Sequence, residues 1–92
     1  MILRRNGWRD ADELREAAER STLEGEKVPD EVRWIRSYVL AEVSGAVGTV
    51  CIYQASGPDA IRRHAAAADL PVDEIVPVAD VVVRPDPEPA VI

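Results

Sequence analysis

The stretch that decides the fold lies between residues 32 and 55 and reads VRWIRSYVLAEVSGAVGTVCIYQA. Residues 32–43 are rich in β-branched and aromatic types, which favours a long strand. Residues 44–48 (SGAVG) contain two glycines and predict a turn, and residues 49–55 predict the second arm of a hairpin. The centre of the chain is therefore expected to form two long antiparallel strands.

The segment before this hairpin predicts a strand and a helix. Residues 2–5 (ILRR) predict a short strand that ends at the turn pair Asn6-Gly7. Asp10 is a typical N-cap, and Glu13 stands where its capping-box partner is expected. Apolar residues then recur at helical spacing, and the segment closes at Gly25 and Pro29. The stripe consists of Leu14, Ala17 and Ala18, followed by Ser21.

The segment after the hairpin predicts a second helix and a last strand. Residues 56–59 (SGPD) are typical of a helix start, because proline is tolerated in the first turn. This helix is expected to run to about Asp69 and to stop before Leu70-Pro71. Residues 74–84 predict a final strand in which Pro77 indicates an edge, a bulge or a late start. Residues 85–92 form a proline-rich tail outside the domain of residues 1–84.

The predicted order is β-α-β-β-α-β, which is the ferredoxin-like plan of the α+β class. Such a domain has a four-stranded antiparallel sheet with two helices on one face. The long strands are apolar on both sides, so the open face of the sheet also needs a cover. A second copy of the chain is the simplest cover, and we expect a homodimer that forms an α+β barrel.

Length, composition and charge set limits on function. The chain has 92 residues, no Phe and a net charge of −6, and the charge argues against binding to nucleic acid or to an anionic membrane. The single cysteine, Cys51, excludes an intrachain disulfide and fits a reducing compartment. The sequence has no signal-peptide pattern and no membrane-spanning apolar run. We therefore expect a small soluble cytoplasmic protein.

His64, the sole histidine, is the most informative residue. It shares the apolar stripe of the second helix with Ile61, Ala65 and Ala68, so it is expected to face the sheet. One interpretation is a core histidine that is satisfied by a local hydrogen bond. The other is a ligand or proton-transfer group in a cleft between helix and sheet, with small alanines leaving room beside the ring.

A second set of candidates lies on the hairpin. Cys51 and Tyr53 share one face of their strand, and alternation places Trp34 and Tyr38 on one face of the other strand. If these faces meet, they form an aromatic-lined pocket that His64 covers. Cys51 then serves either as a small hydrophobe or as a soft metal ligand beside His64.

In these residues the chain resembles a family of small bacterial proteins, mostly of unassigned function, whose characterised example is described as nickel-binding. The resemblance runs from about Arg33 to Pro85, through residues 34–39 (WIRSYV), residues 51–53 (CIY) with Ala55, residues 61–65 (IRRHA), Pro71, Val78 and Val82. It implies a dimeric ferredoxin-like barrel that binds a transition metal, with nickel first. The positions carried over to a site are Trp34, Ser37, Tyr38, Cys51, Tyr53 and His64, with His64 and Cys51 as metal ligands.

Three functions follow from this pattern. The first is a small binding protein that holds a metal ion or a small ligand near His64. The second is a dimeric barrel enzyme, similar to an oxygenase or isomerase, with His64 as general base and Tyr38 or Tyr53 as proton donor. The third is a structural or regulatory module whose sheet only dimerises. A large cleft that brings His64 and a tyrosine hydroxyl to one point would favour the enzyme.

Overall fold

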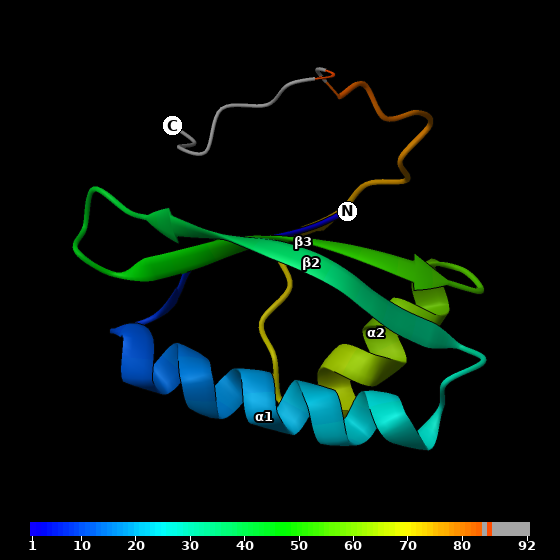
Figure 1. Ribbon diagram of the computed structural model, residues 1–92. Coiled ribbons are helices and arrows are strands. Elements are labelled where there is room, and N and C mark those ends of the chain that lie inside the picture. Colours follow the sequence, from blue (N-terminus) through cyan, green and yellow to red (C-terminus); the bar gives the residue numbers. More distant parts are fainter. Residues whose placement is uncertain (84, 86–92) are drawn as a thin grey trace.

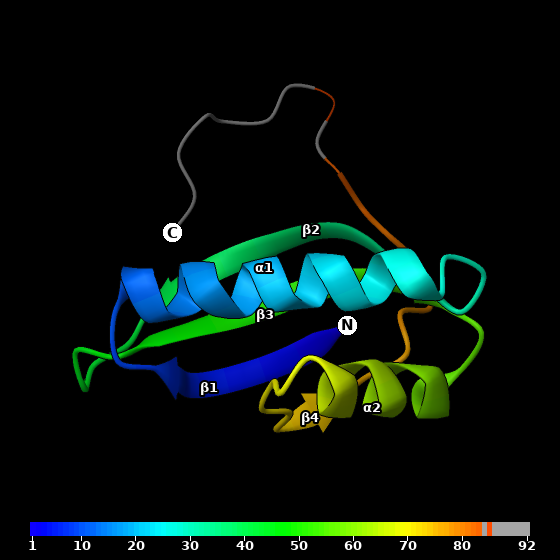
Figure 2. The same ribbon diagram turned by 90° about the horizontal axis from the view of Figure 1, so that it is seen from below.

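A computed structural model describes residues 1–83 and residue 85 of the chain. The elements are β1 (Ile2–Trp8), α1 (Ala11–Lys27), β2 (Val32–Ala41), β3 (Val47–Ala55), α2 (Pro58–Ala67) and β4 (Glu74–Ile75). The strands form one antiparallel sheet in the order β2-β3-β1-β4. Both helices cover the same face of this sheet (Figures 1 and 2). The predicted ferredoxin-like α+β fold is confirmed.

Local signals in the sequence explain where the first helix begins and ends. The Asp10 side chain accepts a hydrogen bond from the Glu13 amide at 2.9 Å, as expected for an N-cap. The Glu13 carboxylate accepts from the Arg9 amide at 3.3 Å, one residue before the position that a capping box uses. The helix continues through Gly25 to Lys27, and Val28 is its C-cap.

The last strand is much shorter than predicted. Residues 74–84 were expected to be extended in the sheet, but only Glu74 and Ile75 pair with β1. Pro77 has no amide hydrogen and cannot continue the ladder, and the valines that follow it are exposed. The segment from residue 76 to residue 83 instead rises from the face of the sheet opposite the helices (Figure 1). The predicted tail, apart from Pro85, and residue 84 lie outside the described residues.

The hydrophobic core lies under α2. Its buried members come from β1, β2, β3 and α2: Ile2, Val32, Cys51, Ala60 and Ile61. Because two of the four residues that α2 buries are alanines, its backbone can approach the sheet closely. By contrast α1, which the structure describes completely, buries only Ala17. The space between α1 and the sheet is therefore where the fold leaves room.

Carboxylates cap the backbone of β1 where its regular pairing stops. Asn6 has a positive φ of 50°, and the pairing of β1 with β3 is irregular between Arg4 and Trp8. The freed Asn6 amide donates to the Glu42 carboxylate at 2.7 Å, and the Arg5 amide donates to the Asp73 carboxylate. The two acids thus satisfy donors that neighbouring strands do not reach.

Candidate functional site: a pocket between the first helix and the sheet

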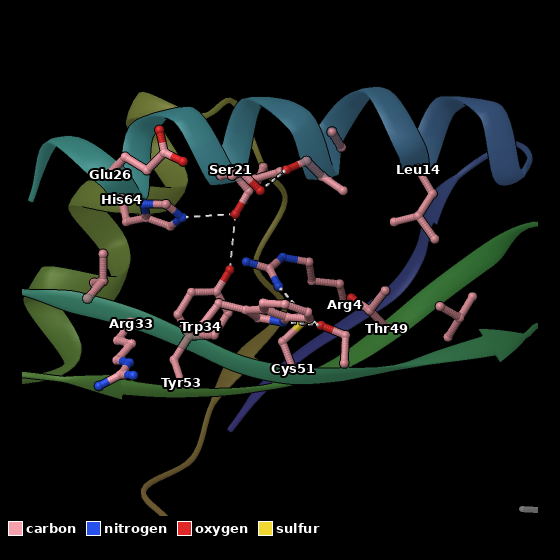
Figure 3. Close-up of a pocket in the computed structure, with 18 of the residues that line it drawn as sticks. Arg4, Leu14, Ser21, Glu26, Arg33, Trp34, Thr49, Cys51, Tyr53 and His64 are labelled. Carbon is pink, nitrogen blue, oxygen red and sulfur yellow. Dashed lines mark hydrogen bonds between the residues drawn. The ribbon is translucent and has the colours of Figure 1, made fainter. Parts of the chain in front are cut away.

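A pocket of about 570 Å³ lies between α1 and the sheet (Figure 3). This volume is in the range of small-molecule sites in proteins. Most of its wall is apolar, and a few polar groups converge inside. The lining includes Arg4, Trp8, Leu14, Ala17, Ala18, Ser21, Gly25, Glu26, Val32, Trp34, Ser37, Val39, Thr49, Cys51, Tyr53, His64 and Leu70.

The pocket exists because α1 lines it mainly with small side chains. The face of α1 toward the sheet carries Leu14, followed along the helix by Ala17, Ala18 and Ser21. At the paired positions Arg4 and Thr49, β1 and β3 present polar residues to the pocket. Since the chain has no Phe, little else can fill the gap.

His64 points inward, as its helical spacing predicted. The residue is 4% exposed, and its Nε2 lies 3.1 Å from the Ser21 hydroxyl. Burial lowers the pKa of His64, the positive charge of Arg4 lowers it further, and Glu24 opposes the shift. The imidazole is therefore neutral at neutral pH and can either donate or accept a proton through Nε2.

Ser21 joins His64 to Tyr53. The Ser21 hydroxyl is 3.0 Å from the Tyr53 hydroxyl, so one serine connects a residue of α2 with a residue of β3. The Tyr53 and His64 rings lie 5.8 Å apart between centroids and are tilted by 53°. Burial raises the pKa of Tyr53, and the hydrogen bond with Ser21 only partly offsets this. The Tyr53 hydroxyl consequently keeps its proton at neutral pH.

Cys51 belongs to a separate group of hydrogen bonds. The Trp34 indole donates to the Ser37 hydroxyl at 2.9 Å, and that hydroxyl donates to the Cys51 sulfur at 2.9 Å. The Arg4 Nη1 donates to the same sulfur at 3.3 Å. Figure 3 draws Cys51 and His64 with different partners, so the thiol is not activated by the imidazole.

Five of the six predicted site residues line the pocket, and Tyr38 does not. The prediction that Trp34 and Tyr38 share a face is wrong because β2 contains a bulge. Trp34 pairs with Tyr53 and Arg36 pairs with Ile52, so Ile35 is an extra residue that reverses the alternation. Tyr38 is opposite Val50, on the face of the sheet away from the helices.

Arg4 and Ser21 are site residues that were not predicted as such. Arg4 is 2% exposed, and its Nε donates to the Pro71 carbonyl at 2.6 Å. The available signal was the alternation in the first strand, which places Arg4 on the same side as the core residue Ile2. For Ser21 the signal was its place at the end of the apolar stripe of α1.

The donors for a metal ion are few in one chain. Among the described residues, no group of three or more His, Cys, Asp or Glu side chains could hold an ion. The positive charge of Arg4 also disfavours a second cation beside Cys51. A nickel ion bound by His64 and Cys51 alone does not fit this arrangement, because nickel takes four to six ligands.

Family comparison gives the pocket a context. Residues 1–78 match the family described as nickel responsive protein SCO4226-like. The chain belongs to this family. No curated protein and no solved structure matches the chain significantly. In the described part of the SCO4226-like chain, neither helix has the length and apolar character needed to cross a bilayer.

The matched residues include the whole pocket. All residues named above as its lining, from Arg4 to Leu70, fall within the 78 residues that define the SCO4226-like match. The resemblance seen in the sequence thus extends through β1 and α1, which supply Arg4 and Ser21.

Proposed function

We propose that this SCO4226-like protein is a small binding protein of the nickel response and that its ligand site is the pocket under α1. The observation that carries the proposal is a preformed hollow of about 570 Å³ in a chain of only 92 residues. Keeping such a hollow open forfeits packing that would stabilise a small domain. Occupation by a ligand would restore that packing, which is why we favour a binding role over a purely structural one.

The proposed ligand is a small organic molecule that enters beside His64, Ser21 and Tyr53. These side chains offer a neutral imidazole and two hydroxyls at one end of a pocket whose wall is mostly apolar. The alternative ligand is a transition metal at His64, with nickel first, completed by donors from a second copy of the chain. Titration distinguishes these ligands.

The test is calorimetric titration of the intact protein with Ni²⁺, Zn²⁺ and Cu²⁺, and separately with a library of small organic molecules. The organic-ligand proposal predicts saturable binding that His64→Ala weakens and that Arg62→Ala, an exposed change on α2, leaves unchanged. Saturable Ni²⁺ binding that only His64→Ala abolishes would favour the metal alternative. If neither class binds, the proposed function is wrong.

A second candidate function is an enzyme that uses His64 as general base. The observation in its favour is the Ser21 hydroxyl, which lies within hydrogen-bond distance of both His64 and Tyr53 inside a large pocket. An enzyme would convert a bound molecule and would show a pH profile set by His64. Recovery of the bound ligand chemically unchanged after long incubation would exclude this reaction for that ligand.

We also propose that two copies associate through the sheet face opposite the helices. The central positions of this face are apolar and not fully buried: Leu3, Leu40, Val50 and Ile52, with Tyr38 at 44% exposure. A sheet face of this composition is normally covered.

Size-exclusion chromatography with light scattering tests this association. We expect twice the chain mass of 10.1 kDa for the wild type and for Val43→Lys, a fully exposed position beyond β2. We expect a single-chain mass for Tyr38→Lys. A wild-type protein that elutes as a monomer at high concentration would refute the dimer.

A further inference from the structure

Arg4 carries a buried positive charge that no carboxylate of the described residues neutralises. The residue is 2% exposed, and its bonded partners are the Pro71 carbonyl and the Cys51 sulfur. Within residues 1–83, none of the ion pairs involves Arg4. Buried charges in proteins are normally paired with an opposite charge, so this arrangement lacks an anion.

One guanidinium nitrogen of Arg4, a residue that lines the pocket, makes no hydrogen bond within the described residues. This nitrogen is Nη2, and it is buried. Thr49 is directly opposite Arg4 across the β1–β3 pair, so both side chains lie on the helix-facing side of the sheet. The Thr49 hydroxyl is likewise buried and unpartnered in the described chain. Both residues line the pocket, so its wall contains a buried guanidinium N–H and a buried hydroxyl without partners in the described chain, and both can donate.

Figure 3 shows where these donors lie. The Arg4 guanidinium occupies the middle of the pocket, between α1 and the strands. The one acidic residue among the described lining is Glu26, an exposed residue near the end of α1. The remaining wall is mostly apolar and includes Leu14, Val39 and both tryptophans.

We propose that the pocket binds a small organic anion, a carboxylate with an apolar body, whose charged oxygens pair with Arg4 and Thr49. This inference rests on the proposed function and specifies the chemistry of its ligand. A carboxylate accepts from a guanidinium N–H and a hydroxyl at once, and such charge-assisted hydrogen bonds are the stronger ones in proteins. The apolar body of the ligand would contact the surrounding wall, beneath Ala17 and Ala18.

The probes are pairs of molecules that differ only in charge. The acid members are 4-phenylbutyrate and the linear carboxylates from butanoate to octanoate, and each is compared with its neutral amide. Because Trp8 and Trp34 both line the pocket and are the only two tryptophans of the chain, intrinsic fluorescence reports occupancy. Isothermal titration calorimetry gives the dissociation constants independently.

We expect at least one carboxylate to bind at least about 10-fold more tightly than its amide. Arg4→Met should weaken binding of that acid by about 10- to 100-fold and leave binding of the amide nearly unchanged. Arg62→Met, which removes an exposed charge from α2, should change neither. Circular dichroism verifies folding of Arg4→Met, and the acid–amide comparison on the wild type needs no variant.

The outcomes separate this inference from the function on which it rests. If the amides bind as tightly as the acids, the pocket is a ligand site but the anion inference is wrong. If neither series binds at millimolar concentration, the anion inference fails, whereas the proposed function fails only if the metals and the wider library do not bind either. Ultraviolet thiolate absorbance at neutral pH, absent in Cys51→Ser, would show that Cys51 already supplies the negative charge, and it would also overturn the anion inference.

Discussion

Replacing Ser21 with alanine should destabilise the protein, because one hydroxyl connects the buried His64 with the half-buried Tyr53. The Ser21 oxygen lies 3.0 Å from the Tyr53 hydroxyl and 3.1 Å from the His64 Nε2. Each hydrogen bond contributes about 0.5–1.5 kcal/mol, so the loss of both costs about 1–3 kcal/mol. Alanine is a better helix former than serine by about 0.5 kcal/mol, which offsets part of this cost. The net decrease in the free energy of unfolding is therefore about 0.5–2.5 kcal/mol.

Thr22→Ala is the matched control. Thr22 is the next residue of α1, is exposed, and bonds only to the Ala18 carbonyl one turn earlier. Thr22 also lines the pocket, but this substitution removes neither bond of Ser21 and gains the same kind of helix propensity, so it should leave stability unchanged or raise it slightly.

The assay is urea unfolding of both variants and the wild type, followed by far-ultraviolet circular dichroism. For a domain of this size each kcal/mol corresponds to a melting-temperature shift of about 4–8 °C, which thermal scans measure independently. If Ser21→Ala matches Thr22→Ala in both measurements, the two hydrogen bonds contribute nothing to folding. The argument that Ser21 organises this end of the pocket would then be wrong.

Three further predictions concern stability. Because burial lowers the pKa of His64 from its ordinary value of 6.5, the native state binds fewer protons than the unfolded state, and the free energy of unfolding should fall as pH drops below that value. The free energy of unfolding should change by at most about 1.4 kcal/mol per pH unit. Urea unfolding measured at several pH values below 6.5 should show a weaker pH dependence for His64→Gln than for the wild type. A methyl group at Gly48 would lie 2.5 Å from the Arg4 carbonyl oxygen, whereas at Gly57 it would meet no atom within 4 Å. Gly48→Ala should therefore lower the free energy of unfolding by about 1–3 kcal/mol, and Gly57→Ala by less than about 0.5 kcal/mol. Thermal unfolding measures both, and equal stability of the two variants would contradict the close contact of Gly48 with β1. Asp10→Ala removes the N-cap of α1 and should cost about 1 kcal/mol, with faster hydrogen exchange confined at first to that end of the helix.

The order of the elements could be predicted because it depends on local patterns. Helical spacing placed His64 toward the sheet, and the Asp10 cap marked the start of α1; the structure confirms both. These features are set by a few neighbouring residues, so no knowledge of tertiary packing is needed. The pairing of two copies depends on an interface between chains and stays a prediction.

Other features depend on tertiary structure and could not be predicted. The extra residue Ile35 has no composition signal of its own, yet it moves Tyr38 away from the pocket. A buried arginine such as Arg4 runs against the general preference of arginine for the surface. The hollow itself is a property of how α1 and the strands meet, because the same alanines could have packed closely elsewhere.

One of the acids that cap β1 has a consequence for how the protein behaves when crowded. A strand with free amides is a template on which another molecule can extend its own sheet, and such growth leads to aggregates. At Arg5, on the side of β1 where the short strand β4 has already ended, the amide is occupied by the carboxylate of Asp73. An incoming strand would have to displace this negative charge, so Asp73 protects this edge of a thinly packed domain from pairing with its neighbours.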